Sequence, residues 1–158
     1  MNFFLLLIFC EVVSIYAAQC PSGWVQEASS CYLFVTSSRE HWTTSSFHCS
    51  LHGASLVEID SAKENDFLRK HLTDLGVHTD FWIGLTDDSL EGQWEWLPSA
   101  ETSGFTDWAP GQPDNGHNED CAVLSHHSDY HWNDDQCDNS HYFICEKEVS
   151  GDSMIVIG

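Results

Sequence analysis

Between Pro98 and Asp120 the sequence gathers side chains whose oxygen atoms are suited to binding a hard metal ion. Carboxylates stand there next to Asn, Gln and Gly, among three prolines and three glycines. Closely packed carboxylates repel one another unless a cation lies among them. Ca²⁺ takes about 6–8 such oxygen ligands at about 2.3–2.6 Å. This stretch therefore predicts a calcium site, while the simpler interpretation is a solvated acidic surface.

The charge distribution of the whole chain favours a metal ion over nucleic acid or lipid. From His71 to Glu146 there are 16 Asp or Glu residues and no Lys or Arg. Over the 158 residues, 5 Lys and Arg stand against 25 Asp and Glu, a formal net charge of −20. A chain this acidic is not expected to bind nucleic acid or an anionic lipid surface. Its 42% hydrophobic and 13% aromatic residues are typical of a globular protein.

The acidic stretch has no helical or strand period, so regular elements on either side must hold it. Trp108 and Cys121 would tether a loop of this length. Ser61 followed by Glu64 is a capping-box pattern, which predicts a helix that ends at Gly76. The length allows one domain. A further helix is expected over 39–51, and strands over 24–36, 81–85, 93–97, 122–124 and 142–145.

The first 18 residues resemble a secretory signal peptide. An apolar block runs from Phe3 to Phe9, and the small residues Ala17 and Ala18 offer a cleavage site. A membrane anchor is the alternative, but a spanning helix needs about 18 or more apolar residues and this run is shorter. We therefore expect a secreted, extracellular protein without membrane insertion. Residues 149–158 are interpreted as a short C-terminal tail.

Six cysteines remain after such a cleavage, and an even number in a small exported chain predicts a disulfide framework. The absence of a Cys-x2-Cys pair disfavours zinc binding by cysteines. Spacing alone does not choose among the 15 possible pairings. Two short closures look natural, Cys20 with Cys31 and Cys121 with Cys137, which would leave Cys49 with Cys145.

Four short motifs in this chain resemble, in order and approximate spacing, those of C-type lectin domains. The resemblance extends over about Cys20 to Glu148, so we assign such a domain to residues 19–148. It implies an α+β fold in which two helices flank antiparallel sheets beside a long calcium-organised loop. The long form of the family also implies the disulfides Cys20–Cys31, Cys49–Cys145 and Cys121–Cys137. The motifs are Trp82-Ile83-Gly84-Leu85, Gln112-Pro113-Asp114, Glu119-Asp120-Cys121 and Trp132-Asn133-Asp134.

The resemblance further implies a Ca²⁺ ion that binds sugar directly. In this family the free coordination positions of the ion take two adjacent sugar hydroxyls. Pro113 would follow a cis peptide bond, so that both flanking side chains face the metal. Carried over by motif, the ligands in this chain would be Gln112, Asp114, Glu119, Asn133 and Asp134.

An auxiliary calcium site is also implied, with Glu119 shared between the two ions. Two ions would pin the loop from both sides. Asp87 and Glu91 alone have a simpler interpretation as polar residues beside a turn. The five residues that would form this site are Asp87, Glu91, Asn115, Glu119 and Asp120.

The order of amide and acid in Gln112-Pro113-Asp114 bears on sugar specificity. The mannose-type motif of the family has Glu first and Asn last, whereas here the two are exchanged. This exchange resembles the galactose and N-acetylgalactosamine binders, so we expect glycans with terminal galactose-type sugars as partners. Those binders commonly carry a Trp two residues after the Asp, where this chain has Gly116. Binding of mannose as well is therefore an alternative.

The remaining aromatic and imidazole side chains have mostly structural interpretations. Three histidines within six residues, His126, His127 and His131, are able to hold a transition metal only where geometry brings them together. Any one of four residues is a candidate platform for the sugar in place of the missing Trp: Tyr130, His117, His126 or His127. The residues assigned to the core rather than to a sugar platform are Trp82, Ile83, Trp94, Trp96, Trp108 and Trp132.

Three classes of function are compatible with these features. The first is a secreted calcium-dependent lectin that recognises glycans or microbial surfaces and agglutinates, with a homo-oligomer formed through the domain surface. The second is an acidic structural protein of mineralised matrix, since so much negative charge suits calcium carbonate faces. The third is an enzyme such as a glycosidase with paired carboxylates. Catalysis is not expected, because the metal would occupy the carboxylates and the chain has no nucleophile motif.

Overall fold

The last strand of the domain, β8 (His141–Glu148), lies inside the sheet between segments from far earlier in the sequence. The computed structural model describes residues 19–102 and 104–149. β8 pairs antiparallel with β2 (Ser30–Glu40) and parallel with β4 (Phe81–Thr86). The sheet is therefore mixed, and the expectation of antiparallel sheets was wrong for this one pair. The parallel pair arises because β8 is inserted between β2 and β4 in the same direction as β4.

The other strands extend this sheet in the order β1-β2-β8-β4-β6-β7. β3 (Ser55–Leu56) pairs with β8, and β5 (Glu95–Trp96) pairs with β4. The edge strands are β1 (Val25–Glu27) and β7 (His131–Asp135), and β6 (Cys121–Ser125) lies beside β7. A single turn of 3-10 helix, η1 (His126–Ser128), connects β6 to β7. The sequence did not predict β7, because its residues are mostly polar.

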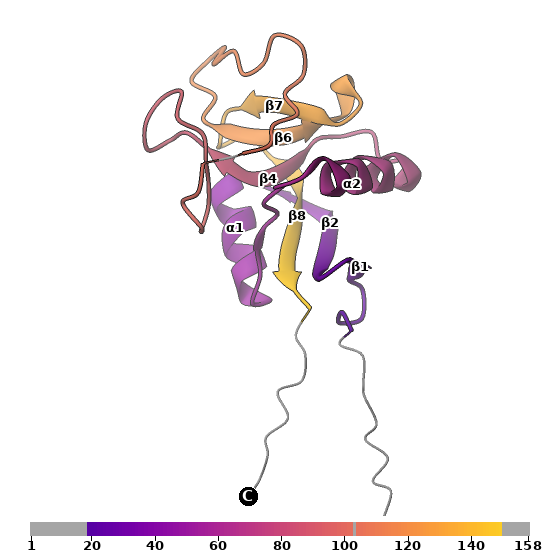
Figure 1. The fold of residues 1–158 in the computed structure, drawn as a ribbon. Coiled ribbons are helices and arrows are strands. Elements are labelled where there is room, and N and C mark those ends of the chain that lie inside the picture. Colours follow the sequence, from indigo (N-terminus) through magenta and orange to yellow (C-terminus); the bar gives the residue numbers. More distant parts are fainter. Residues whose placement is uncertain (1–18, 103, 150–158) are drawn as a thin grey trace, which may run out of the picture.

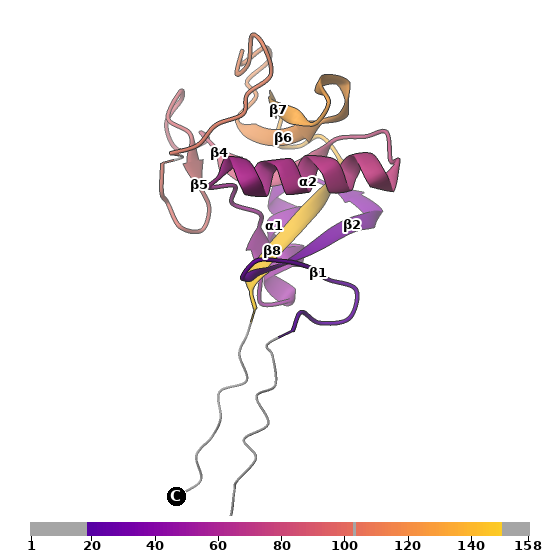
Figure 2. The ribbon, with the colours of Figure 1, turned by 45° about the vertical axis from the view of Figure 1, so that its right-hand side comes forward.

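Two helices pack on this framework, as expected. α1 (Trp42–Leu51) and α2 (Ala62–Leu75) are visible in Figure 2. The predicted cap of α2 is present, because the Ser61 hydroxyl accepts a hydrogen bond from the backbone amide of Glu64. Gly76 ends the helix with φ 64°, a left-handed conformation that glycine adopts without strain.

The hydrophobic core is aromatic, as the sequence predicted. Trp82, Ile83, Trp96 and Trp132 are buried. Trp94 and Trp108 are partly buried and pack edge to face with ring centroids 4.8 Å apart. Trp108 also contacts Trp132. These indoles therefore fix the position of the long loop and are not exposed platforms for a ligand.

Three disulfides close the fold, and they are the three that were expected. Cys20–Cys31 ties the N-terminal segment to β2, Cys49–Cys145 joins α1 to β8, and Cys121–Cys137 brackets the hairpin of β6 and β7. The acidic loop therefore runs directly into a hairpin that is covalently closed.

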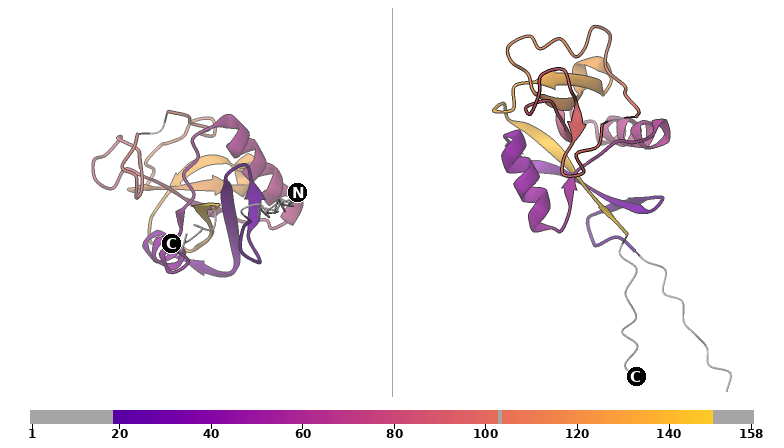
Figure 3. Two further views of the ribbon diagram at one scale, coloured as in Figure 1. Left: turned by 60° about the horizontal axis from the view of Figure 1, so that its bottom comes forward. Right: turned by 60° about the vertical axis from the view of Figure 1, so that its left-hand side comes forward.

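The long loop lies at one end of the domain, and β1 and the end of β8 lie at the other. Figures 1 and 3 show the loop beyond β6 and β7, and β1 and the end of β8 at the other end. The Val149 amide still donates a hydrogen bond to the Ser29 carbonyl, at 2.7 Å. The expected signal peptide (1–18) and the rest of the tail (150–158) lie outside the described residues. In the part that is described, no helix combines the length and apolar character needed to cross a membrane.

Candidate functional site

The base of the long loop is attached to strand β7. The Ala109 amide donates to the Trp132 carbonyl at 2.8 Å, and the Trp132 amide donates to the Asp107 carbonyl at 2.9 Å. The backbone of Trp132 therefore holds the base of the loop through two hydrogen bonds, while its buried indole packs in the core. The strand that holds the loop also contains the next two residues, Asn133 and Asp134.

Helix α2 holds the same part of the loop through a buried polar network. Asn65 is 2% exposed, accepts a hydrogen bond from the Trp132 indole at 2.9 Å and donates to Asp107 Oδ2 at 2.6 Å. Arg69 Nη1 and His131 Nδ1 lie 3.3 Å and 2.9 Å from the same Asp107 oxygen. These positioning residues carry no sequence signal, because Asp107 is one of many acids and Asn65 lies in an ordinary helix.

Three of the predicted ligands converge at the top of β7. One carboxylate oxygen from each of Asp114, Glu119 and Asp134 lies within 4.8 Å of the other two. Asp134 is fully buried, Glu119 is half-buried and Asp114 is exposed. The group is therefore open to solvent on one side and closed on the other, which suits an ion that also contacts an external ligand.

Hydrogen bonds from the loop backbone hold these carboxylates in place. The amides of Asp114 and Asn115 donate to Asp134 Oδ2 at 3.0 Å and 2.6 Å. The Gly116 amide donates to Glu119 Oε2 at 3.1 Å, and Asn115 Oδ1 accepts from the Glu119 amide at 2.8 Å. Polar groups of the loop and of β7 therefore hold the conformation of this segment together.

The two predicted amide ligands border the same group. The Gln112–Pro113 peptide bond is cis, as the family resemblance implied. Gln112 Nε2 lies 3.4 Å from Asp114 Oδ2, and its buried Oε1 has no hydrogen-bond partner among the described residues. Asn133 donates from Nδ2 to the Asp134 carbonyl. A buried oxygen without a donor is costly unless something binds it, and a metal ion among the neighbouring carboxylates would satisfy the Gln112 oxygen.

The electrostatics of the group match a divalent cation. Burial raises the pKa of Glu119, and the charges of Asp134, Asp135 and Asp114 raise it further. Three carboxylates so close together repel one another, and a cation among them removes that repulsion. Oxygen donors without sulfur or imidazole select a hard ion such as Ca²⁺. The residues present therefore fit the calcium ion that the sequence predicted.

The auxiliary group is only partly assembled. Asp87 is 2% exposed, its Oδ2 accepts from the Gly92 amide at 2.8 Å, and its buried Oδ1 has no partner in the described part of the chain. Burial raises the pKa of Asp87, and the charges of Glu91 and Asp120 add to this. The Asp87 amide donates to the Asp120 carbonyl at 3.1 Å. Asp87, Glu91 and Asp120 are therefore electrostatic neighbours with one unpaired buried oxygen.

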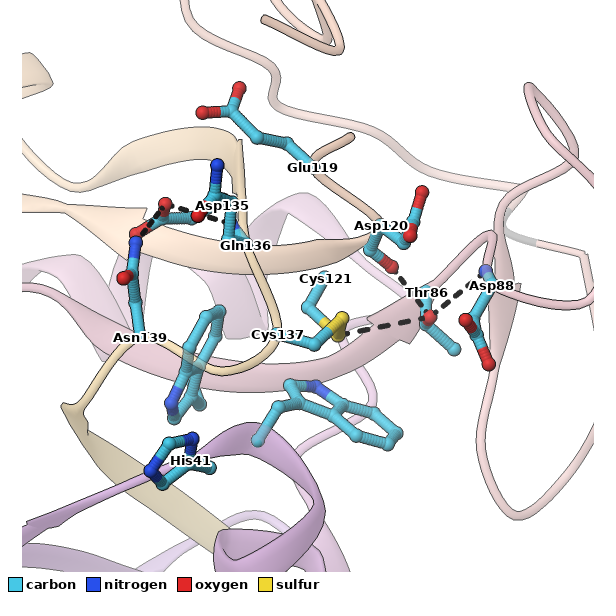
Figure 4. Close-up of a disulfide and its surroundings, with 12 residues drawn as sticks. His41, Thr86, Asp88, Glu119, Asp120, Cys121, Asp135, Gln136, Cys137 and Asn139 are labelled. Atoms are coloured by element: carbon cyan, nitrogen blue, oxygen red, sulfur yellow. Dashed lines mark hydrogen bonds between the residues drawn. A yellow bond between two sulfur atoms is a disulfide. The ribbon is translucent and has the colours of Figure 1, made fainter. Parts of the chain in front are cut away.

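The remaining auxiliary residues have other partners. Asn115 holds the Glu119 amide, and the Asp120 carboxylate accepts from Asn118 at 2.6 Å. Figure 4 shows Thr86 between Asp120 and Asp88, beside the Cys121–Cys137 disulfide. The structure thus brings the sugar-site acids together more closely than the five oxygen donors of the auxiliary set.

Gly116 lies close to two of the converging carboxylates. A Cβ atom at Gly116 would lie 3.1 Å from Asp114 Oδ1 and 3.3 Å from Glu119 Oε2. Of the candidate platforms, Tyr130 is buried, and His126 and His127 belong to η1, at the far end of the β6–β7 hairpin from Asp134. His117 is exposed within the loop, and its carbonyl accepts from Gln136 at 3.0 Å. His117 is therefore the one candidate of these four that lies beside the acidic group.

Comparisons with known proteins agree with this architecture. The family model of the lectin C-type domain matches residues 38–147. Asialoglycoprotein receptor 1 of Rattus norvegicus is 39% identical over 137 residues, which cover 82% of this chain and 45% of the receptor. Perlucin of Haliotis laevigata is 37% identical over 131 residues, which cover 82% of this chain and 83% of perlucin. The chain thus spans less than half the length of the rat receptor.

Solved structures show the same fold. The carbohydrate-recognition domain of the mouse scavenger receptor C-type lectin superposes with a TM-score of 0.78 at 35% sequence identity. The match covers 84% of this chain and 100% of the mouse domain.

Proposed function

The chain belongs to the C-type lectin domain family, and on that premise we propose that it is a calcium-dependent sugar-binding protein. Family membership establishes a carbohydrate-binding domain of a kind that is generally not enzymatic. The convergence of Asp114, Glu119 and Asp134 is the observation that carries the calcium dependence. Gln112 and Asn133 complete the proposed ligand set, which is the one expected from the sequence.

A bound Ca²⁺ would supply open coordination positions for two neighbouring hydroxyls of a sugar. The protein contributes the directions of the hydrogen bonds around them. Each carboxylate ligand accepts from a hydroxyl, and each amide ligand donates through its NH₂ group. Asp114 and Glu119 would accept, while Gln112 and Asn133 would donate. The positions of the acid and amide ligands around the ion therefore decide which pair of sugar hydroxyls can form all of these hydrogen bonds.

We assign terminal galactose-type sugars to this site. Gln112 and Asp114 carry amide and acid in the exchanged order, and the rat relative is by its name a receptor for asialoglycoproteins. Such a name, which describes glycoproteins without sialic acid, supports a galactose-type ligand. Gly116 leaves the apolar face of the sugar without an indole, so we expect weaker discrimination against mannose than a Trp at this position would give.

The expected low affinity of a single sugar site bears on how the protein would be used. One exposed site makes few contacts, so its dissociation constant for a monosaccharide should be about millimolar. Useful binding then needs several sites on one particle. A secreted protein with an auxiliary calcium, acting on glycan-covered or microbial surfaces as an oligomer, is the setting that we propose.

A glycan array with and without EDTA tests the proposal most directly. The wild type is compared with the double variant Gln112→Glu, Asp114→Asn. This variant has the mannose-type order, with the acid first and the amide last, and the same net charge as the wild type. We expect galactose-type binding in calcium, no binding in EDTA, and a shift toward mannose in the double variant. Binding that persists in EDTA would contradict the calcium mechanism, and an unshifted array would contradict the specificity argument.

A further inference from the structure

Two histidines from different segments face each other at the end of the β6–β7 hairpin that lies away from the acidic loop. The rings of His78, after α2, and His126, in η1, have centroids 4.7 Å apart with planes tilted by 58°. His127 is next to them, with its ring centroid 5.5 Å from that of His126. From the sequence, His126 and His127 were grouped with His131. In the structure the histidine near them is His78 and not His131. His131 instead contacts Asp107 and Arg69.

The two segments that carry these rings are joined by partly buried hydrogen bonds. The Tyr130 hydroxyl donates to the Val77 carbonyl at 2.6 Å, immediately before His78. The His126 amide donates to Asp80 Oδ1 at 2.7 Å. The Tyr130 amide also closes the η1 turn onto the Ser125 carbonyl at 2.7 Å. Because the two backbone segments are already held together, metal binding needs to order little more than the two histidine side chains.

The two rings border a small cavity whose lining includes one acidic residue, Asp129. His78, His126, Asp129 and Tyr130 line a cavity of about 120 Å³, together with Thr73 and Gly76. Neither imidazole forms a side-chain hydrogen bond with any other described residue, so the ring nitrogens are available. Asp80 and Asp129 lie on the same two segments and contribute negative charge. Imidazole nitrogens without hydrogen-bond partners in the part that the structure describes, on segments that also carry Asp80 and Asp129, form a suitable environment for a cation.

We propose that His78 and His126 together bind a divalent transition-metal ion of the Zn²⁺ or Cu²⁺ type. Two imidazoles that each place a nitrogen about 2.0–2.1 Å from one ion, at a near-tetrahedral angle, have ring centroids about 5 Å apart. The observed 4.7 Å is close to that separation. Imidazole nitrogen selects these ions over Ca²⁺, which prefers oxygen. The proposed transition-metal site thus lies away from the proposed calcium sites and selects a different kind of ion.

The metal has room for further ligands. Within the described residues, the one group of three or more His, Cys, Asp or Glu side chains close enough to share an ion is Asp114, Glu119 and Asp134. Water, or a donor from another molecule, therefore completes the coordination around His78 and His126. This predicts an exchangeable metal rather than a structural one.

Titration of ZnCl₂ into the untagged full chain, with its disulfides formed and with CaCl₂ in excess, tests the proposal by calorimetry. Excess calcium keeps Zn²⁺ from the carboxylates. We expect one exchangeable Zn²⁺ site in the wild type that remains measurable in excess calcium. His78→Gln and His126→Gln each remove a direct ligand and should weaken binding by at least about 10- to 100-fold, the loss that follows even from removing an outer-shell partner. Electron paramagnetic resonance with Cu²⁺ should show coupling to two nitrogens in the wild type and one in either variant.

The chain offers a matched control in a second pair of histidines. His48, in the last turn of α1, and His52, which caps the C-terminus of that helix, have ring centroids 5.5 Å apart, but the Lys147 ammonium is 3.0 Å from the His52 carbonyl. His48→Gln should leave the Zn²⁺ site unchanged. The proposal is overturned if the wild type binds no Zn²⁺ in excess calcium, or if His78→Gln and His126→Gln bind it as tightly as His48→Gln does. Retained galactose binding in each variant confirms that the fold is intact.

Discussion

The backbone amide of Asn115 donates a 2.6 Å hydrogen bond to Oδ2 of Asp134, so the middle of the loop lies directly on a carboxylate of strand β7. The same fully buried carboxylate lies within 4.8 Å of those of Asp114 and Glu119. One side chain thus both shapes the loop and contributes charge to the proposed metal site. The loop conformation and the affinity for calcium should therefore change together.

Asp134→Asn tests this coupling. The amide keeps one oxygen for the loop amides but removes one of the three negative charges. We expect calcium affinity to fall by about tenfold or more, equivalent to about 1.4 kcal/mol, and galactose binding to fall with it. Calcium calorimetry and retention on immobilised galactose measure the two effects. Asp129→Asn, an exposed acid beyond η1, is the control, and equal affinities in both variants would contradict the assignment.

Asp87→Asn should have opposite effects with and without calcium. Burial raises the pKa of Asp87, so the folded state loses stability as pH rises above the ordinary pKa of an Asp. At pH 7 in EDTA, the variant should therefore be at least as stable as the wild type. An auxiliary ion at about 100 times its Kd contributes about 2.7 kcal/mol, and the variant loses this contribution. Thermal unfolding in EDTA and in calcium measures both, with exposed Asp88→Asn as the control.

Asn65→Ala should destabilise the domain by disconnecting α2 from the loop. The change leaves the buried Trp132 indole N–H without its 2.9 Å acceptor. An unpaired buried donor costs about 1–3 kcal/mol. Urea unfolding in saturating calcium measures the loss, and Thr43→Ala on the exposed side of α1 should change stability little. Unfolding midpoints that agree for the two variants would show that the network is not stabilising.

Glu64→Gln should flatten the dependence of stability on pH. Burial first, and then the charge of Glu146, raises the pKa of Glu64 to about 7, despite the hydrogen bond that it accepts from Tyr32. The folded state keeps this proton longer than the unfolded state, so its contribution to stability is complete below about pH 4.5 and is lost as pH rises to about 7. Unfolding free energies between pH 4 and pH 8 should fall less steeply in the variant than in the wild type. Asp66→Asn, exposed on the same helix, should retain the wild-type slope.

The parts of this fold that could be predicted are those encoded by neighbouring residues. Ser61 and Gly76 set the two ends of α2 through a local hydrogen bond and a local backbone conformation. The positions of these two residues in the sequence are therefore sufficient to predict where the helix begins and ends. The Glu64 side chain, however, does not complete a capping box. It accepts instead from the Asp60 amide at 3.2 Å and from the Tyr32 hydroxyl at 2.6 Å, and no local rule specifies a contact with β2.

The sequence motifs identified the three acids that converge, but not how they are brought together. These motifs name Asp114, Glu119 and Asp134, but β7 has the polar sequence HWNDD and becomes a strand through its pairing with β6. The approach of His78 to His126 depends on how α2 and η1 pack. Neither relationship has a period or a spacing from which the sequence could reveal it.

The position of β1 and of the end of β8, away from the loop, has a practical consequence (Figure 1). A scaffold fused at either end of the domain will point every copy of the loop outward. Trimeric or pentameric fusions should therefore convert a weak monosaccharide reagent into a probe for glycan-coated cells without redesign of the binding surface.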